Sequence, residues 1–235
     1  MHEARIGAWC GEALVDPLDP IDAVEKAPGR VPAQTVARLT VYRKVLAELH
    51  AEGVENVYSH RLADLAGVHP AQLRRDLAIF GSFGSISRGY EVYQLSLTIG
   101  RLLGTDRQQT VALVGLGNLG RTLLTYHGFE ERGFHIGVVF DKDREKVGRV
   151  YAGRRCHPVE EIEEVLPEYG ARIAILACGP VGVEAVVDRL ARAGVKSILN
   201  FVPRRIPAPP GVHVEDIDIS ATLEMLSFLS KGGDE

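Results

Sequence analysis

Cysteine is scarce in this chain, with three residues among 235. Cys10, Cys156 and Cys178 lie far apart, in none of the spacings of metal sites, and an odd, sparse count does not predict a disulfide framework. Long apolar runs are lacking too, since no segment approaches the roughly 18 apolar residues of a membrane span. The first twenty residues lack the basic stretch and apolar run of a secretory signal. These absences predict a cytoplasmic protein in a reducing compartment, with no membrane partner.

An excess of positive charge is also missing. The chain carries 27 Lys and Arg against 31 Asp and Glu, and residues 31–100 carry seven basic and six acidic side chains. Bulk charge therefore does not predict a nucleic-acid binder, and any contact with DNA must come from a few placed residues. What is present is an ordinary globular composition, 46% hydrophobic, with enough length for two domains.

The N-terminal part predicts an extension followed by a helix. Residues 1–30 mix acids, prolines and scattered apolar side chains without a sustained period, which predicts a mostly flexible extension. From Pro32 to about Gly53 apolar residues recur near a period of 3.6, which predicts one amphipathic helix. Its apolar positions are Val36, Leu39, Val41 or Tyr42, Val45, Leu46 and Leu49.

Residues 59–80 have the pattern of two short helices joined by a turn. Ser59 is predicted to cap the first helix, Gly67 to allow the turn and Pro70 to begin the second helix. Together they predict a helix-turn-helix. The second helix is predicted to turn Leu73, Leu77 and Phe80 inward and Gln72, Arg74, Arg75 and Asp76 outward.

Such an outward face is typical of a recognition helix, because Arg and Gln side chains reach phosphates and base edges in a major groove. The alternative is an ordinary helical hairpin with a solvated basic face. The next ten residues, GSFGSISRGY from Gly81 to Tyr90, contain three glycines and three serines and favour a tight hairpin. A hairpin here would be a wing that lays Arg88 along the minor groove, whereas the alternative is a flexible linker. The predicted DNA contacts are Ser59, His69, Gln72, Arg74, Arg75, Ser82, Arg88 and Tyr90.

The segment VALVGLGNLG, from Val111 to Gly120, predicts a dinucleotide-binding turn. An apolar helix from Tyr93 to Leu103 precedes it and is predicted to bridge two domains. A buried strand then runs into the glycines, and a helix from Asn118 to about Tyr126 follows, so its free N–H groups can face a pyrophosphate. Strand, turn and helix occur in the order that this chemistry needs. The three glycines of the motif are Gly115, Gly117 and Gly120.

The next predicted strand, FHIGVVFD, ends at Asp141, 21 residues beyond Gly120. An acidic side chain at this place is predicted to accept hydrogen bonds from both adenosine ribose hydroxyls and to disfavour the phosphate of NADP. The pattern therefore favours NADH and NAD+, although Lys142 and Arg144 leave NADP open. A Rossmann-like fold whose nucleotide site is unused is the other alternative.

Strand and helix patterns continue to alternate. Strands are predicted at residues 172–178, 197–201 and 213–219 and a helix at 181–193, which gives an α/β fold with a doubly wound parallel sheet. Ligands bind at the carboxyl ends of such strands, and the residues predicted there are Ala177, Cys178, Asn200 and Phe201. Cys178 is open to two interpretations, a redox thiol or a small packing residue.

After the sheet, only one short helix remains, with Leu223, Leu226, Phe228 and Leu229 as its apolar residues. It is too small to form the substrate domain of a dehydrogenase, and the histidines occur singly, without a catalytic partner at a suggestive spacing. The sequence therefore predicts that the chain is not an enzyme and has no metal site. The apolar helix is predicted to pack against a partner subunit, by exchange between two chains.

Several motifs together resemble one known family. They are VPxxTVxRL from Val31, LRRDLxxFGSFG from Leu73, VGLGNLG from Val114, YxGF from Tyr126, FDxDxxKVG from Phe140 and ILNFVP from Ile198. From about Val31 to Leu229 the chain is similar to the Rex family of redox-sensing transcriptional repressors.

The resemblance implies a homodimer that binds an inverted-repeat operator in double-stranded DNA, with NADH weakening and NAD+ permitting DNA binding. It also implies a C-terminal helix swapped between subunits. Tyr126 resembles the family's tyrosine beside the nicotinamide, and Asp218 the aspartate that couples cofactor state to domain position. Replacing Asp218 with Ala is expected to leave DNA binding that ignores the NADH/NAD+ ratio.

The expected organisation is an extension (1–30), a winged helix (31–92), a Rossmann domain with its linker helix (93–219, helix 93–104), and a C-terminal dimerisation helix and tail (220–235). The expected cofactor residues are Gly115, Gly117, Asn118, Leu119, Gly120, Tyr126, Asp141, Lys142, Ala177, Cys178, Asn200, Phe201 and Asp218.

The chain also departs from the family pattern. Ile86 stands where the family has its minor-groove arginine, and Arg88 comes two positions later. Lys44 replaces an arginine of the coupling network, and Ile219 replaces a phenylalanine that covers the nicotinamide. Two alternatives therefore stay open beside the repressor, a sensor of the same fold that acts on a protein partner and a small oxidoreductase.

Overall fold

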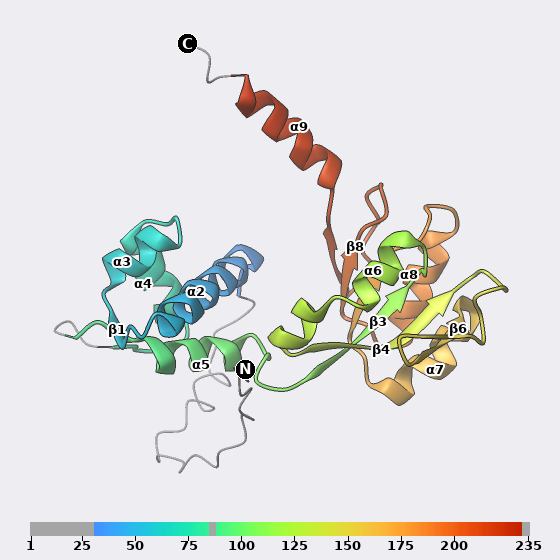
Figure 1. Cartoon of the computed structure of the whole chain (residues 1–235), viewed down its shortest axis with the longest axis horizontal. Helices are drawn as coiled ribbons and strands as arrows, with labels where there is room; N and C mark the ends of the chain where they lie inside the picture. Colours follow the sequence, from blue (N-terminus) through green and yellow to red (C-terminus); the bar gives the residue numbers. More distant parts are fainter. Residues whose placement is uncertain (1–30, 85–87, 232–235) are drawn as a thin grey trace, which may run out of the picture. The chain divides into compact units, whose positions relative to one another are not determined.

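The computed structural model describes residues 31–84 and 88–231 (Figure 1). The chain divides into two compact units, Met1–Asp106 and Arg107–Glu235. The predicted extension of residues 1–30 lies outside the described residues, as do residues 85–87 of the predicted wing and residues 232–235 of the predicted tail.

The first unit is built from four helices and a two-stranded ladder in its described part. Its long helix packs along the last helix of the unit, and buried leucines from every helix form one core. In chain order the elements are α2 (Ala33–Ala51), β1 (Asn56–Val57), α3 (Ser59–Leu65), α4 (Pro70–Ala78), β2 (Tyr90–Glu91) and α5 (Val92–Leu102).

The buried face of α2 is slightly rotated from the predicted one. Thr35 and Tyr42 are buried, whereas Val36 is 38% exposed and Val41 is also exposed. The helical period explains the difference, because Thr35 lies one turn before Leu39 on the same face and Val36 does not. The other predicted inward positions, Leu39, Val45, Leu46 and Leu49, are buried.

Helix α5 belongs to the core of the first unit. Its Val92, Leu95 and Ile99 are buried among the residues of α2, α3 and α4. The sequence-based boundary at residue 92 counted this helix with the Rossmann domain, whereas the division between the two compact units falls after Asp106. An apolar linker helix stabilises the unit in which its apolar side chains are buried.

The helix-turn-helix forms as predicted, with different caps. Tyr58 occupies the N-cap position of α3, so Ser59 is its first residue and makes no capping bond. Gly67 has a φ of +67°, which the turn requires, and Pro70 begins α4. The side chain of His69 caps α4, with its Nδ1 accepting a hydrogen bond from the Ala71 N–H (3.2 Å).

The tip of the predicted wing hairpin, residues 85–87, lies outside the described residues, but its base is described. Among the described residues of Gly81–Tyr90, Tyr90 is the only one in a strand, and its partner is Val57 on the other side of the helix-turn-helix. A Cβ on Gly89 would lie 2.6 Å from the Val57 carbonyl oxygen, and one on Gly84 would overlap the Gly89 carbonyl oxygen. These glycines therefore close the base of the segment against β1, a tertiary contact that local sequence does not show.

The second unit contains a seven-stranded sheet in its described part, with the order β5-β6-β4-β3-β7-β8-β9. All neighbouring strands pair in parallel except β5, which is antiparallel to β6. This is the doubly wound order, which reverses direction at β3. The strands are β3 (Gln109–Val114), β4 (Phe134–Asp141), β5 (Val150–Tyr151), β6 (Arg154–Pro158), β7 (Ile173–Leu176), β8 (Ser197–Asn200) and β9 (His213–Asp216).

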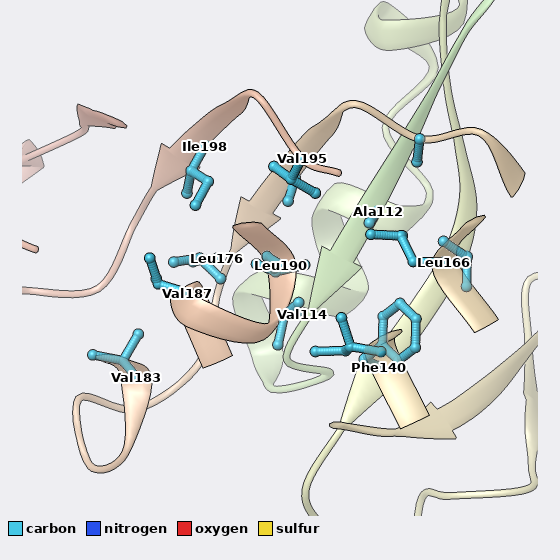
Figure 2. Close-up of a cluster of buried hydrophobic side chains, with 14 of the residues drawn as sticks. Ala112, Val114, Phe140, Leu166, Leu176, Val183, Val187, Leu190, Val195 and Ile198 are labelled. Atoms are coloured by element: carbon cyan, nitrogen blue, oxygen red, sulfur yellow. The ribbon is translucent and has the colours of Figure 1, made fainter. Parts of the chain in front are cut away.

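Helices cover both faces of this sheet. Helices α7 (Ile162–Tyr169) and α8 (Val183–Arg192) bury leucines and valines against one face (Figure 2). Helix α6 (Asn118–Leu124) and the 3₁₀ segment η1 (His127–Arg132) lie on the other face, with Leu113, Leu124 and Ile136 between. Alternate residues of each strand thus enter two separate cores, as parallel strands buried on both faces do.

The chain ends in helix α9 (Ile219–Ser230), which has no buried residue. The preceding strand stops at Asp216, three residues before the predicted end of that strand, because Asp218 caps α9. Within the described part of the chain, no helix has the length and apolar character needed to cross a membrane.

Candidate cofactor and DNA-binding sites

The glycine-rich turn between β3 and α6 is tightly packed on one side and open on the other. Gly115 has a φ of +101°, and a Cβ there would lie 2.5 Å from the Ala177 carbonyl oxygen. A Cβ on Gly120 would overlap the Gly115 carbonyl oxygen, whereas one on Gly117 would meet no atom within 4 Å. Gly115 and Gly120 therefore allow strand, turn and helix to pack, and Gly117 leaves the space into which a pyrophosphate fits.

Asp141 is 6% exposed, and its carboxylate is largely used within the protein. Its Oδ2 accepts from the Leu116 N–H (2.7 Å) and Lys146 Nζ (3.1 Å), and its Oδ1 accepts from the Asp143 N–H (2.9 Å). A carboxylate accepts about four hydrogen bonds, so one position remains. In this arrangement the carboxylate also holds the glycine-rich turn, and its contact with the ribose hydroxyls stays a prediction.

Burial alone would raise the pKa of Asp141, but the hydrogen bonds from Leu116, Asp143 and Lys146 outweigh burial and lower it. The carboxylate is therefore ionised at neutral pH. Lys146 was not predicted as a site residue, although it is the lysine of the FDxDxxKVG motif. The motif contains Lys146, but its spacing alone does not tell which of Lys142, Arg144 and Lys146 turns toward Asp141.

A cavity of about 400 Å³ lies beside the turn, at the carboxyl ends of β3, β4 and β7. This volume is within the range of small-molecule sites. Six predicted cofactor residues line it, namely Gly115, Gly117, Asp141, Lys142, Ala177 and Cys178. Its other lining residues include Val159 and Glu160 beside α7, and Val183, Val186 and Arg189 on α8, none of which was predicted.

The predicted nicotinamide-side residues lie outside this cavity. The Tyr126 ring is exposed, packs edge-on against Phe129 (centroids 5.1 Å apart) and would collide with a Cβ on Gly128. Asn118 and Leu119 begin α6 and are exposed, as the predicted N-terminal turn facing a ligand requires.

Asn200, Phe201 and Asp218 have structural contacts. The Asn200 side chain is buried, donates to the Arg204 carbonyl and the Asp216 carboxylate, and accepts from the Val202 N–H. Both Nδ2 hydrogens of Asn200 are therefore used within the protein, and its contact with a cofactor stays a prediction. Phe201 packs against the core on the α6 side of the sheet, and Asp218 accepts from the Ala221 N–H (2.9 Å) as the cap of α9.

Cys178 lines the cavity and is half-buried. Burial raises the pKa of its thiol above the ordinary value. A protonated thiol is a poor nucleophile, which favours packing over the redox-thiol interpretation.

The DNA-binding candidates gather around α4. Arg74 and Arg75 are exposed, and Arg74 Nη1 donates to Ser59 Oγ at the start of α3 (3.2 Å). Arg74 and Ser59 border a cavity of about 410 Å³, which is also lined by Tyr58, Phe83, Gly84, Gly89 and Tyr90. A guanidinium and a hydroxyl that share one hollow can both contact a phosphate.

Asp76, predicted on the outward face of α4, is buried instead. Arg38 on α2 donates to both its oxygens (2.6 and 2.7 Å), and Tyr42 Oη and Gln72 Nε2 donate as well (both 2.8 Å). Gln72 is half-buried and its Oε1 accepts from Arg75 Nη2 (2.9 Å). The cluster fixes α4 against α2 and holds Arg75 at the surface.

The remaining DNA candidates divide by burial. His69, Ser82 and Arg88 are exposed. Tyr90 is 9% exposed and its burial raises the pKa of its phenol, so its ring forms the floor of the hollow beside Arg74. Tyr90 thus lines the same hollow as Ser59 and Arg74, and its contact with DNA stays a prediction.

Comparison with known proteins finds matches for both units. The family model described as "CoA binding domain" matches residues 106–204, and the one described as "Putative DNA-binding protein N-terminus" matches residues 30–78. The redox-sensing transcriptional repressor Rex of Desulfitobacterium hafniense is 40% identical over 199 residues, which are 85% of this chain and 95% of that protein. The Rex repressor of Streptomyces coelicolor is 39% identical over 207 residues, 87% of this chain and 80% of that protein. The chain belongs to the Rex family.

Solved Rex structures have the same fold. The Rex-family repressor RSP in complex with β-NAD+ and operator DNA superposes with a TM-score of 0.80 at 31% identity, covering 86% of this chain and 94% of that one. RSP in complex with β-NADH gives a TM-score of 0.76 at 30% identity, covering 86% and 95%. The predicted fold, a winged-helix type DNA-binding unit followed by a Rossmann-like parallel sheet, is confirmed.

Three of the residues that depart from the Rex pattern, Lys44, Arg88 and Ile219, lie within the described residues, and all three are exposed. Lys44 is exposed on α2, with its Nζ 4.0 Å from Glu48 Oε1, and Ile219 is the exposed first residue of α9. Arg88 is exposed, and Ile86 lies outside the described residues.

Proposed function

We propose that this Rex-family repressor binds operator DNA through α3 and α4 as a homodimer, senses the NADH/NAD+ ratio at the glycine-rich turn, and leaves DNA when NADH is bound. The observation that carries the proposal is the open side of Gly117, beside the 400 Å³ cavity. It occurs in a chain whose other unit exposes Arg74 and Arg75 on a helix-turn-helix. The relatives are repressors, which supports a regulatory and non-catalytic role.

In the proposed site, the Gly117 backbone and the N-terminus of α6 would hold the pyrophosphate. Asp141 would accept from one ribose hydroxyl with its remaining position, and the valines of the cavity would contact the adenine. A nicotinamide cofactor supplies two redox states that differ by a hydride and a ring charge. Tyr126 is proposed to contact the nicotinamide end, outside the cavity of the single chain.

In the proposed DNA complex, Arg74 and Ser59 would share a phosphate, and Arg75, aligned by Gln72, would reach base edges. Two recognition helices are needed for an inverted repeat, so two chains must associate. Helix α9 supports association because it exposes Leu223, Leu226 and Phe228 to solvent in the single chain.

Coupling follows from linkage. If bound DNA weakens the affinity for NADH by some factor, bound NADH must weaken the affinity for DNA by the same factor. Asp218 is proposed to transmit the cofactor state because it caps α9, the helix assigned to the partner contact. The change that it transmits would therefore alter the start of the dimerisation helix.

The first experiment is fluorescence anisotropy with a labelled inverted-repeat duplex that the protein itself selects from random DNA. Titration with NADH and, separately, with NAD+ measures release at fixed, stated salt concentration. We expect NADH to release the duplex and NAD+ to leave it bound. The proposal is wrong if no duplex is selected while NADH still binds, which would redirect the search to a protein partner.

A further inference from the structure

The 400 Å³ cavity has two walls from different elements. One wall is the 3₁₀ segment η2 (Val159–Glu161), which follows β6, and the other is α8. Val159, Val183 and Val186 line it, so its sides are largely apolar, and Val183 also closes one end of the core in Figure 2. Flat apolar sides with few polar groups are suited to a nucleobase.

This cavity corresponds to the adenosine half of a dinucleotide. Gly117 and Asp141 line it, whereas Tyr126 and Asp218, assigned to the nicotinamide end, do not. A contact that sets the distance between η2 and α8 would therefore affect the adenine end alone.

Arg189 makes such a contact. It lies in the last turn of α8 and is half-buried, and its Nη1 donates to the Glu160 carbonyl oxygen in η2 (3.1 Å). The same nitrogen donates to Glu163 Oε1 on α7 (3.3 Å), whose carboxylate also receives Arg192 (2.9 and 3.0 Å). One guanidinium thus joins the two walls and is itself held by a carboxylate.

We infer that Arg189 is a positioning residue of the adenine end, which fixes η2 against α8 and so sets the width of the pocket for the base. The inference rests on the proposed function, since it assumes that an adenine dinucleotide occupies this cavity. Arg189 acts through the backbone of Glu160 and contributes specificity for adenine compounds as a class. Arg192 shares the same carboxylate but does not line the cavity, so its contribution is to the surface alone.

The test compares Arg189→Met with the matched control Arg192→Met in the full chain. Both remove a guanidinium bound to Glu163, but only the first frees Glu160. Isothermal titration with NADH and with ADP-ribose, which lacks the nicotinamide, measures affinity for the whole ligand and for its adenosine half. We expect Arg189→Met to weaken both ligands by about the same factor, roughly tenfold, as for loss of one well-placed hydrogen bond. Arg192→Met should stay within about twofold of the unchanged chain.

Two further readouts separate positioning from general loss of structure. Arg189→Lys keeps the charge and a donor but loses the rigid, planar guanidinium that places Nη1 between Glu160 and Glu163, so it should restore part of the affinity. The factor by which NADH weakens operator binding should be unchanged in Arg189→Met when the cofactor is saturating, and its melting temperature should match that of Arg192→Met.

The inference is overturned if Arg189→Met binds ADP-ribose as tightly as the unchanged chain, or if Arg192→Met loses as much. If the unchanged chain binds neither NADH nor ADP-ribose, the proposed function itself fails and the inference fails with it.

Discussion

Asp76 lies within the recognition helix α4, yet it is 2% exposed and accepts hydrogen bonds from Arg38, Tyr42 and Gln72. Burial alone would raise the pKa of its carboxyl, but these hydrogen bonds outweigh burial and lower it. The ionised carboxylate therefore holds α4, the proposed recognition helix, against α2. At the scale of single residues, the geometry of the proposed DNA-binding surface depends on a buried charge.

We expect Asp76→Asn to destabilise the first unit by about 3 kcal/mol, because Arg38 keeps its positive charge but loses the negative partner that neutralises it. Hydrogen exchange of the α2 and α4 amides in the full chain measures this loss. The control is Asp64→Asn, an exposed acid on α3. Equal protection in the two variants would contradict a role for Asp76 in stability.

The same position gives a pH dependence of defined sign. The folded pKa of Asp76 lies below the unfolded value of about 3.9, so its contribution is fully present above that pH and is lost as pH falls through the folded pKa. The melting temperatures of the unchanged chain and Asp76→Asn should therefore differ at pH 7, and the difference should shrink as pH falls below about 4. A difference that had not shrunk at all by pH 3 would show that the carboxylate charge is not its source.

At the scale of elements, different glycines of the turn before α6 have different roles. Gly120 allows the turn to pack against α6, whereas Gly117 is proposed to leave space for the ligand. Gly120→Ala should destabilise the second unit, because its Cβ would overlap the Gly115 carbonyl oxygen. Gly117→Ala should leave the melting temperature unchanged, because its backbone is unstrained and its Cβ meets no atom. Gly117→Ala should lower the affinity for NADH by about tenfold or more, since the methyl group would occupy the space proposed for the pyrophosphate. Thermal melts and NADH titrations measure the two effects, and normal NADH affinity in Gly117→Ala would place the ligand elsewhere.

The elements were predictable from sequence where a local rule decides them. The glycine turn, α4 and the strand ending at Asp141 follow from residue type and period. Strands β5 and β6 were missed because Val150–Tyr151 is too short and Arg154–Pro158 too polar to stand out.

The cavity wall was missed for a different reason. Val159 follows β6 and Arg189 lies on the helix after β7, so the two residues come together only when both strands join one sheet. Nothing in either local sequence pattern shows that they will be close. Asp76 likewise sits on a helix face whose burial depends on Arg38, 38 residues earlier. Periodicity predicts which residues form an element, whereas contacts between elements decide what each polar side chain does.

At the scale of the whole molecule, helix α9 is proposed to set the state of association. Replacing Leu226 and Leu229 with Glu should give monomers in sedimentation velocity, because these exposed side chains are proposed to pack on the second copy. Operator affinity should fall by about a hundredfold or more, since two linked half-site contacts become independent. Ser227→Glu, on the same helix, is the control. A dimer that survives the double substitution would remove α9 from the interface.

The chain passes from the first unit to the second after Asp106, and all strands of the seven-stranded sheet and every residue that lines the 400 Å³ cavity lie beyond that point. Exchange of the first unit by gene fusion would therefore break no sheet pairing in the second. The proposed cofactor site would therefore stay whole when the first unit is replaced. Under the proposed function, choice of operator and binding of cofactor could then change separately, by recombination at the boundary after Asp106.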